Sequence, residues 1–293
     1  MTHPVGEDLT RAVLARLDGC ADARFRQVMQ ALVNQLHAFA REVRLTPDEW
    51  RAAIDFLTAT GQACTPQRQE FILLSDTLGL SMLVAALTQA GAGEAGQGAI
   101  EATEATVEGP GYADGAPECP CGTDIAEGVR GEPTFYAGRV TDTEGTPLAG
   151  ALLDVCSGDG PGGDDVQAGA PMRARGRFRT DDQGRYWFWS IRPVPGPVPA
   201  DGPVGRMLAR MGRHPYRPGR IHMKVSAAGH RPVTTQLFVA GSDYLDSDAV
   251  FGVRDSLVVD FDHHGPGEAP DGRRMRKPYW SAHYDFRLAP AEG

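Results

Sequence analysis

The spacing of apolar residues changes partway along this 293-residue chain, and that change constrains the fold more than any other feature. From residue 7 to about residue 90, apolar side chains recur every three or four positions, as in amphipathic helices. From Thr134 onward, apolar and polar residues alternate, as in half-buried strands. Residues 91–133 are rich in Gly, Pro and Glu and contain few apolar residues, which indicates a connection. We therefore predict a helical part followed by a β part.

The first part is predicted to form four helices. Residues 46–49, Thr-Pro-Asp-Glu, have the composition of a helix start, with threonine as N-cap, proline at the first helical position and acids in the first turn. A single last helix is expected from about residue 66 to residue 87. The apolar stripe of the second helix comprises Phe25, Val28, Met29, Leu32, Leu36, Phe39 and Val43. Stripes of this strength predict that the helices cover one another in a homodimer.

The second part is predicted to contain at least eight strands. The candidates are residues 135–140, 151–155, 177–180, 185–189, 221–226, 234–239, 256–261 and 279–288. Two turn signals separate neighbouring candidates: Glu-Gly-Thr-Pro at 144–147, and Asp-Asp-Gln-Gly at 181–184, which is typical of a hairpin. Many short strands joined by Gly and Pro turns predict a β-sandwich or a barrel.

Composition narrows the possible partners and compartments. A net charge of −9 argues against binding to nucleic acid or to an anionic membrane. We expect a cytoplasmic protein, because the chain lacks a basic and apolar leader and any apolar run of about 18 residues. Its five cysteines are too scattered for a disulfide framework or a zinc site. The chain has neither a phosphate-binding glycine loop nor a Gly-x-Ser-x-Gly elbow, which excludes the common nucleotide-binding and hydrolase motifs.

Long stretches of the chain resemble the intradiol ring-cleavage dioxygenases, and in particular hydroxyquinol 1,2-dioxygenases. The helical part contributes LHAFAREVRLTPDEW, AAIDFLTATGQ and RQEFILLSDTLGLSMLV. The β part contributes GRVTDTEGTPLAGALLDV, RGRFRTDDQGRYWF, GRHPYRP and TTQLFVAGSDYLDSDAVFGVRDSLVVDF. The resemblance runs from about residue 8 to residue 290 and implies an α+β fold. It implies an N-terminal helical dimerisation domain over residues 1–104, with a linker at its end, and a catalytic β-sandwich over residues 105–293.

The resemblance also implies a ferric site of two tyrosinates and two histidines, but this sequence departs from it at three of the four positions. The tyrosine of the pattern Trp-x-Ala-Asn-x-x-Gly-x-Tyr-Asp-x-Gln becomes Asp164. The tyrosine of Val-Pro-Tyr-Pro-x-Pro becomes Gly196. In Arg-Pro-x-His-x-His the first histidine becomes Arg220 and the second remains as His222. Glycine offers no ligand and arginine stays protonated. We therefore expect no cofactor, regard iron as doubtful and assign no metal ligands.

The substrate side of the site is partly retained. The resemblance implies that Arg217 and Gln236 stabilise a charged substrate, and with His222, Asp164 and Arg220 they make up the expected catalytic set. The expected substrate-binding residues are Leu73, Asp76, Val107, Gly109, Pro110, Gly111, Cys156 and Gly196. Positions 111, 156, 164 and 196 each lose an aromatic ring from one cavity, which predicts a larger ligand. We further expect Asp164 and Arg220 to form an ion pair across the vacated metal position.

Three functions stay open from the sequence. The first is an iron-independent enzyme that acts on a phenolic, quinone or polyketide-like compound larger than catechol, as in a secondary-metabolite pathway, by acid–base or cyclisation-type chemistry. The second is a non-catalytic binding protein. The third is residual oxidative activity on hydroxyquinol-type aromatics, either with a different metal at Asp164 and His222 or with a substrate that itself reduces oxygen.

Overall fold

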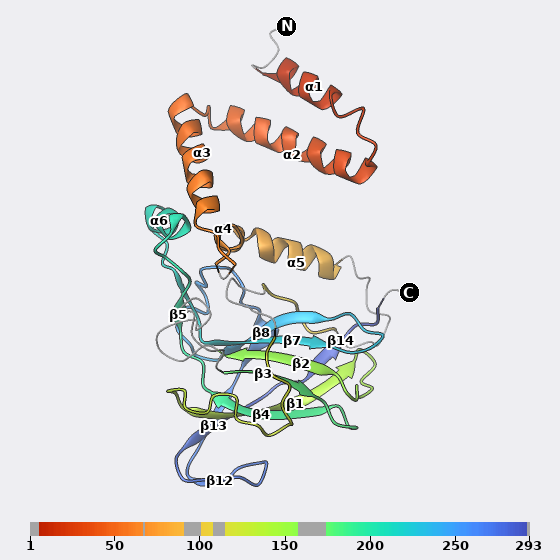
Figure 1. Cartoon of the computed structure of the whole chain (residues 1–293), viewed down its shortest axis with the longest axis vertical. Coiled ribbons are helices and arrows are strands. Elements are labelled where there is room, and N and C mark those ends of the chain that lie inside the picture. Colours follow the sequence, from red (N-terminus) through yellow and green to blue (C-terminus); the bar gives the residue numbers. More distant parts are fainter. Residues whose placement is uncertain (1–5, 67, 91–100, 108–114, 158–173, 292–293) are drawn as a thin grey trace. The chain divides into compact units, whose positions relative to one another are not determined.

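A computed structural model describes residues 6–66, 68–90, 101–107, 115–157 and 174–291 of the chain (Figure 1). The chain divides into two compact units, residues 1–59 and 60–293, and each is described by itself. The domain boundary expected between residues 104 and 105 stays a prediction.

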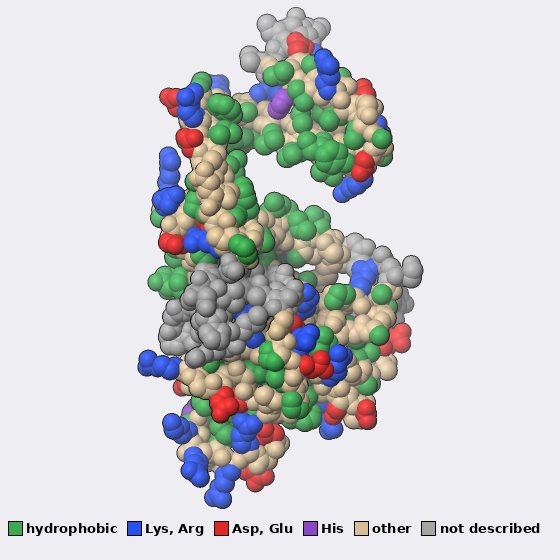
Figure 2. Space-filling view, viewed as in Figure 1, with side chains coloured by type: hydrophobic (Ala, Val, Ile, Leu, Met, Phe, Trp, Pro, Cys, Tyr) green, Lys and Arg blue, Asp and Glu red, His purple; other side chains and the backbone are tan. Residues whose placement is uncertain are grey.

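The first unit is helical. It contains α1 (Glu7–Ala15), α2 (Ala23–Glu42) and most of α3 (Pro47–Gln62). The predicted helix start at Thr46 is confirmed: the Glu49 backbone N–H donates to Thr46 Oγ1 at 3.3 Å, and the Thr46 N–H donates to Glu49 Oε2 at 2.9 Å. No residue of α2 is buried, and Figure 2 shows apolar side chains gathered along this helix.

The second unit begins with a broken helical segment. In place of one long helix, the structure has α4 (Glu70–Thr77) and α5 (Leu80–Ala90), so the prediction of a single last helix was wrong. Gly79 lies between them with a φ of 76°, a left-handed conformation that ends α4. Within the described residues, no single helix has the length and apolar character to cross a membrane. Only α4 and α5 taken together meet those criteria, and they are bent by 75°.

The rest of the second unit is built mainly from short strands. They are β1 (Pro133–Asp142), β2 (Leu152–Ser157), β3 (Arg175–Arg179), β4 (Arg185–Ile191), β5 (Gly196–Pro197), β6 (Tyr216–Arg217), β7 (Arg220–Ser226), β8 (Val233–Val239), β9 (Val258–Val259), β10 (Phe261–His264), β11 (Gly267–Glu268), β12 (Arg274–Met275), β13 (Tyr279–His283) and β14 (Phe286–Leu288). A further helix, α6 (Pro203–Arg210), lies between β5 and β6, and a 3₁₀ turn (Asp255–Leu257) precedes β9.

Two five-stranded sheets form a sandwich. One has the order β10-β13-β1-β14 with β4 also paired to β1, and the other has the order β3-β2-β7-β8-β9. A core cluster fills the space between their facing sides. The ring of Phe188 on β4 stacks on Tyr136 of the same sheet and on Phe178 of the other sheet, in each case with centroids 4.9 Å apart. Ile221 and Met223 from the second sheet are also buried in this cluster. The α+β expectation is therefore confirmed, with a sandwich and not a closed barrel.

The strand pairing differs from the sequence prediction at the turns. Residues 181–184 do form a tight turn, in which the Gly184 N–H donates to the Asp181 carbonyl at 2.9 Å. Yet β3 pairs with β2 and β4 pairs with β1, so this turn crosses between the sheets and is not a hairpin. A turn sequence specifies a chain reversal but not which neighbour receives the strand's hydrogen bonds.

The last two strand candidates are also divided. Residues 256–261 begin in the 3₁₀ turn and continue into β9 and β10, and residues 279–288 are split into β13 and β14. At the second break the chain lies against β1, and a Cβ at Gly138 of β1 would overlap the carbonyl oxygen of Tyr284. The buried Tyr186 hydroxyl donates to that same carbonyl at 2.7 Å. Tyr186 is thus structural.

A buried carboxylate joins α4 to α6 within the second unit. Glu70 is fully buried, and its Oε1 accepts from the backbone N–H of Val204 at 3.0 Å, in the first turn of α6. Its Oε2 accepts from Arg68 Nε at 2.8 Å, and Arg68 also pairs with the exposed Asp201. Gly202 lies so close to Glu70 and Arg68 that a Cβ there would overlap both side chains. This contact holds α6 and the segment that follows β5 against α4.

We expect Glu70→Ala to lower the free energy of unfolding by about 3 kcal/mol, because it removes the buried acceptor of Arg68 and of the Val204 N–H. The matched control is Asp201→Ala, which removes the exposed partner of the same arginine and should cost less than about 1 kcal/mol. Urea denaturation followed by circular dichroism measures both. Equal losses in the two variants would show that Glu70 does not carry the α4–α6 contact.

Candidate functional site

The predicted site residues of three strands form one row on the outer face of the second sheet. His222 of β7 lies in register between Cys156 of β2 and Gln236 of β8, and Arg175 of β3 pairs with Cys156. Their neighbours along the strands point into the core between the sheets: Val155, Ile221 and Leu237. Because side chains alternate along a strand, the row faces away from that core.

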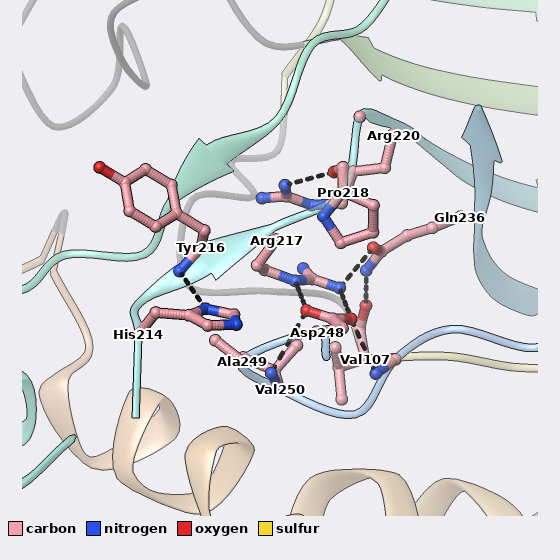
Figure 3. A network of polar contacts seen from close by, with 12 residues as sticks. Val107, His214, Tyr216, Arg217, Pro218, Arg220, Gln236, Asp248, Ala249 and Val250 are labelled. Atoms are coloured by element: carbon pink, nitrogen blue, oxygen red, sulfur yellow. Dashed lines mark hydrogen bonds and ion pairs between the residues drawn. The ribbon is translucent and has the colours of Figure 1, made fainter. Parts of the chain in front are cut away.

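A buried ion pair organises this face. Arg217 of β6 and Asp248 are both almost fully buried; Nε of Arg217 donates to Oδ1 of Asp248 at 2.8 Å and its Nη2 donates to Oδ2 at 3.0 Å. The same Nη2 donates to Oε1 of Gln236 at 3.0 Å. Nε2 of Gln236 in turn donates to the carbonyl of Val107 at 2.5 Å. Figure 3 shows the Arg217 guanidinium directed at Asp248 and Gln236, which fixes the orientation of all three side chains.

Asp248 is also held by its own loop. Its carboxylate accepts from the backbone N–H groups of Val250 at 3.3 Å and Gly252 at 2.9 Å. Residue 252 needs to be glycine, because a Cβ there would lie 2.7 Å from Nη2 of Arg217. Burial by itself raises the pKa of Asp248, but the charge and hydrogen bonds of Arg217, with a smaller contribution from Arg220, hold that pKa below its usual value. The carboxylate is therefore ionised and balances Arg217.

Close backbone packing brings β5 to the same place. Gly196 of β5 pairs with Arg217 of β6. A Cβ at Gly219 would lie 2.6 Å from the Pro193 carbonyl oxygen, so glycine is needed where these two segments touch. Gly196 is different: within the described part of the chain, no atom lies within 4 Å of a Cβ built there, and its φ lies outside the left-handed region. Its backbone conformation therefore suits a larger residue, and no described atom fills the space where that side chain would start.

The helix α4 contributes Leu73 and Asp76, which are both almost completely buried. Neither Asp76 oxygen has a hydrogen-bond partner at normal bonding distance in the described part of the chain. Burial raises the pKa of Asp76, and the nearby Ser81 hydroxyl and the charge of Arg217 offset only part of that rise, while Asp248 adds to it. A partly desolvated carboxyl group thus lies near the Arg217–Asp248 pair.

The structure describes three of the four positions that the resemblance assigns to iron ligands, namely Gly196, Arg220 and His222. Arg220 and His222 lie on β7, and Nη1 of Arg220 donates to the Pro218 carbonyl at 3.3 Å. Asp164 lies outside the described residues, and so does its expected ion pair with Arg220. Gly109, Pro110 and Gly111 of the pocket segment also lie outside them. Of the expected substrate-side residues, the structure brings Arg217, Gln236 and Val107 into direct contact.

Sequence reasoning missed Asp248, the partner of the central arginine. Its only signal was its place in the stretch that resembles the dioxygenases, where several acidic residues occur close together. A cavity of about 510 Å³ next to Asp248 was not foreseen either. Residues 212–214, 245–248, 251, 253 and 254 line it. Such a cavity forms where segments distant in sequence meet, so no local sequence pattern predicts it.

Comparison with known proteins supplies a family. The family profile described as "Catechol dioxygenase N terminus" matches residues 22–96, and the profile described as "Dioxygenase" matches residues 107–290. The hydroxyquinol 1,2-dioxygenase of Nocardioides simplex is 46% identical to this chain over 287 residues, which are 97% of this chain and 96% of the relative. The 6-chlorohydroxyquinol 1,2-dioxygenase of Cupriavidus pinatubonensis is 48% identical over 87% of this chain and 90% of the relative.

Solved structures agree. A hydroxyquinol 1,2-dioxygenase from Pseudomonas putida DLL-E4 superposes with a TM-score of 0.86 and 41% identity, covering 97% of this chain and 98% of the other. A catechol 1,2-dioxygenase from Pseudomonas arvilla C-1 superposes with a TM-score of 0.84 and 28% identity, covering 100% of this chain and 95% of the other.

These comparisons contradict the expectation that the chain has no cofactor, because its relatives are hydroxyquinol 1,2-dioxygenases, which are iron enzymes. The described residues nevertheless do not fit the ferric site of two tyrosinates and two histidines. His222 supplies an imidazole, whereas Gly196 has no ligand atom and the Arg220 guanidinium is a cation. In the described ranges, no group of three or more His, Cys, Asp or Glu residues is placed to hold a metal ion. We therefore derive no chemical step through iron.

The raised pKa of Asp76 predicts that its carboxylate weakens the fold at neutral pH. A raised folded-state pKa means that the stability this group contributes is complete only below the ordinary pKa of 3.8 and is lost as the pH rises through the folded value. We expect Asp76→Asn to raise the free energy of unfolding by about 1–3 kcal/mol at about pH 8, and by less as the pH approaches about 4. Thermal and urea unfolding at both pH values measure the change. The control Asp243→Asn, at an exposed aspartate, should have little effect. A gain for Asp76→Asn that does not depend on pH would contradict the prediction.

Proposed function

Because this chain belongs to the intradiol dioxygenase family, we propose that it binds and transforms a hydroxylated aromatic compound larger than catechol at the Arg217 site. The relatives are named for hydroxyquinol and catechol, which supports an aromatic substrate. The proposed substrate class is phenolic, quinone-like or polyketide-like.

The space at Gly196, which no described atom fills and which lies beside Arg217, is the observation that carries this proposal. Arg217 is the residue expected to stabilise a charged substrate, and its position is fixed by two buried partners. Gly196 is its cross-strand neighbour, and no atom of the described residues lies within 4 Å of the point where a side chain would start. An anchored polar group next to unfilled space is the arrangement expected for a bulky ligand with few polar contacts.

Proton transfer is the chemistry that this chain's own described groups supply. His222 lies between Cys156 and Gln236 on the outer face of the sheet, and an imidazole gains or loses a proton near neutral pH. We propose that it acts as general acid or base in a tautomerisation or ring closure, with Asp164 and Arg220 beside it. Gln236 and Arg217 would hold the substrate oxygen atoms, while Leu73, Asp76, Val107 and Cys156 would bound the ring. The pocket segment Gly109, Pro110 and Gly111 is proposed to lie along the ligand.

Ring cleavage of hydroxyquinol-type aromatics is the second candidate. Identity of 46–48% to hydroxyquinol and chlorohydroxyquinol dioxygenases, over most of the chain, favours it. Oxygen uptake with hydroxyquinol, measured together with the metal content of the same preparation, separates it from the first candidate. Aromatic binding without any turnover would instead support a binding protein.

Refilling the space at Gly196 tests the main proposal. We expect Gly196→Tyr to fold normally and to bind a dihydroxynaphthalene about tenfold or more weakly than the unaltered chain, because the phenol ring would occupy the space that the second ring needs. Binding of the single-ring hydroxyquinol should change less. Isothermal calorimetry with both compounds measures the two affinities.

The matched control is Gly267→Tyr on β11, where a Cβ is equally unobstructed and the backbone is equally ordinary. It should leave both affinities unchanged. Equal binding of the two-ring compound by Gly196→Tyr and Gly267→Tyr would remove the basis for an enlarged pocket.

We also propose a homodimer that forms through the N-terminal helices. The support is α2, where Phe25, Val28, Leu32 and Leu36 are each 45–56% exposed on a helix with no buried residue. Light scattering at micromolar concentration should give the dimer mass for the unaltered chain and for Asn34→Glu, on the other side of α2. The double variant Val28→Glu, Leu32→Glu should give the monomer mass, and a dimer mass there would contradict this interface.

A cytoplasmic location is part of the same proposal. None of the five cysteines, all of which lie in the described ranges, forms a disulfide, which suits a reducing compartment.

A further inference from the structure

We propose that the cavity next to Asp248 is a second binding site, which takes a small organic carboxylate that carries an apolar group. The cavity has a volume of about 510 Å³, which is in the usual range for sites that bind small molecules. Its walls come from residues 212–214, which follow α6, and from the loop at residues 245–254, both within the second unit. Neither Arg217 nor Gly196 lines it, so this inference does not depend on the proposed aromatic site.

Arg213 supplies a positive charge that no carboxylate balances within the described part of the chain. Its Nη1 donates to the Thr77 carbonyl at 2.6 Å, and its Nη2 donates to the Ala249 carbonyl at 2.8 Å. The guanidinium carbon also lies 4.7 Å from the centre of the Phe251 ring. These contacts fix the orientation of the half-buried side chain, but carbonyl groups and a ring do not neutralise its charge. A guanidinium held in this way retains further N–H donors and is well suited to bind a carboxylate.

The other charged residues of the cavity do not cancel the charge of Arg213. Asp248 lines the cavity, but its carboxylate is bonded to Arg217 and to two backbone N–H groups, so its charge is already balanced. Asp246 is exposed, and water screens its charge. Arg254 lies 3.8 Å from a glutamate carboxylate and therefore adds little net charge. The balance of charge in the cavity thus favours an anion.

The wall beside Arg213 is apolar and is held in a strained conformation. Phe251 has a φ of 59°, in the left-handed region that bulky residues rarely adopt, and its side chain is 50% exposed. Tyr244, at the other end of the same loop, has a φ of 68°. Such conformations persist only where surrounding contacts impose them, and they are common at ligand sites. With Leu245 and Val253, the Phe251 ring forms an apolar surface next to the cation, which suits a carboxylate attached to an apolar group.

His214 adds a second donor to the same cavity. Its Nδ1 accepts from the Tyr216 backbone N–H at 3.2 Å, so Nε2 carries the proton of the neutral ring and can donate. The ring of Tyr244 lies against the imidazole, with centroids 4.8 Å apart, and fixes its position. His214 and Arg213 therefore offer N–H donors from neighbouring residues. Donors of this kind bind the oxygen atoms of an anion and repel an organic cation.

Two probes of the same shape test the site: 3-phenylpropionate, which is an anion, and 3-phenylpropionamide, which is neutral. Isothermal calorimetry with the full-length chain measures both affinities. We expect the carboxylate to bind about tenfold or more tightly than the amide, because only the carboxylate forms charge-assisted hydrogen bonds with Arg213. Arg213→Gln should weaken the binding of the carboxylate by a similar factor. Ser247→Trp, which fills the cavity and leaves the hydrogen bonds of Arg213 in place, should abolish the binding of both probes.

The matched control is Gln183→Trp, which places the same side chain at an exposed position of the 181–184 turn and should leave both affinities unchanged. Gly196→Tyr should also leave them unchanged, because it alters the other site. Circular dichroism establishes that each variant is folded; if Arg213→Gln is not, the amide and Ser247→Trp decide the question. Failure of the unaltered chain to bind 3-phenylpropionate, or full binding by Ser247→Trp, would overturn the site. Equal affinity for the two probes would refute its preference for an anion, and loss of binding in Gly196→Tyr would show that the probe occupies the other site.

Discussion

The buried pair of Arg217 and Asp248 is the interaction on which the site depends. A guanidinium and a carboxylate removed from water are costly unless they are paired and hydrogen-bonded. Here the pair shares two hydrogen bonds, Gln236 accepts a third from the guanidinium, and two backbone N–H groups donate to the carboxylate. These bonds tie together β6, β8 and the loop around residue 250, which are distant in sequence. Gly252 exists as glycine so that the arginine can lie against that loop. Loss of either charge would leave the other buried without a partner.

Because the Arg217–Asp248 network is held by its own hydrogen bonds, positions next to it on the outer face of the second sheet can change without unfolding the sandwich. The aromatic core between the sheets, centred on Phe188, lies on the opposite side of the second sheet from Cys156, His222 and Gln236. Residues on the outer face therefore contribute little to the core, and Gly196 or Arg220 can stand where the resemblance places metal ligands. The fold of an iron dioxygenase is retained while the described donor set no longer suits ferric iron. Family membership therefore indicates the fold of this chain, whereas the residues at the site indicate which chemistry its described groups can supply.

The helical segment beside the site is held by a second buried charge. Glu70 of α4 binds the start of α6 through the Val204 N–H, and α6 follows the strand that contains Gly196. The same helix carries the buried Leu73 and places Asp76 close enough to Arg217 for the charge of Arg217 to lower its pKa. Helix α4 therefore both fixes the start of α6 and carries a buried carboxyl group near the Arg217–Asp248 pair.

The sequence by itself determined the order of helical and β parts, the capping box at Thr46, most strand positions and the family. These follow from local periodicity, from side chains that bond within one turn, and from long stretches of resemblance. Only the tertiary structure decided that the turn at 181–184 crosses between sheets, that the last helix breaks at Gly79, and that Asp248 balances Arg217. It also decided that Gly196 has no neighbour among the described atoms within 4 Å of a built Cβ and has an ordinary φ, so the backbone does not require glycine there. Each of these depends on which distant segments meet, and that information resides in burial and in cross-strand register, not in the spacing of neighbouring residues.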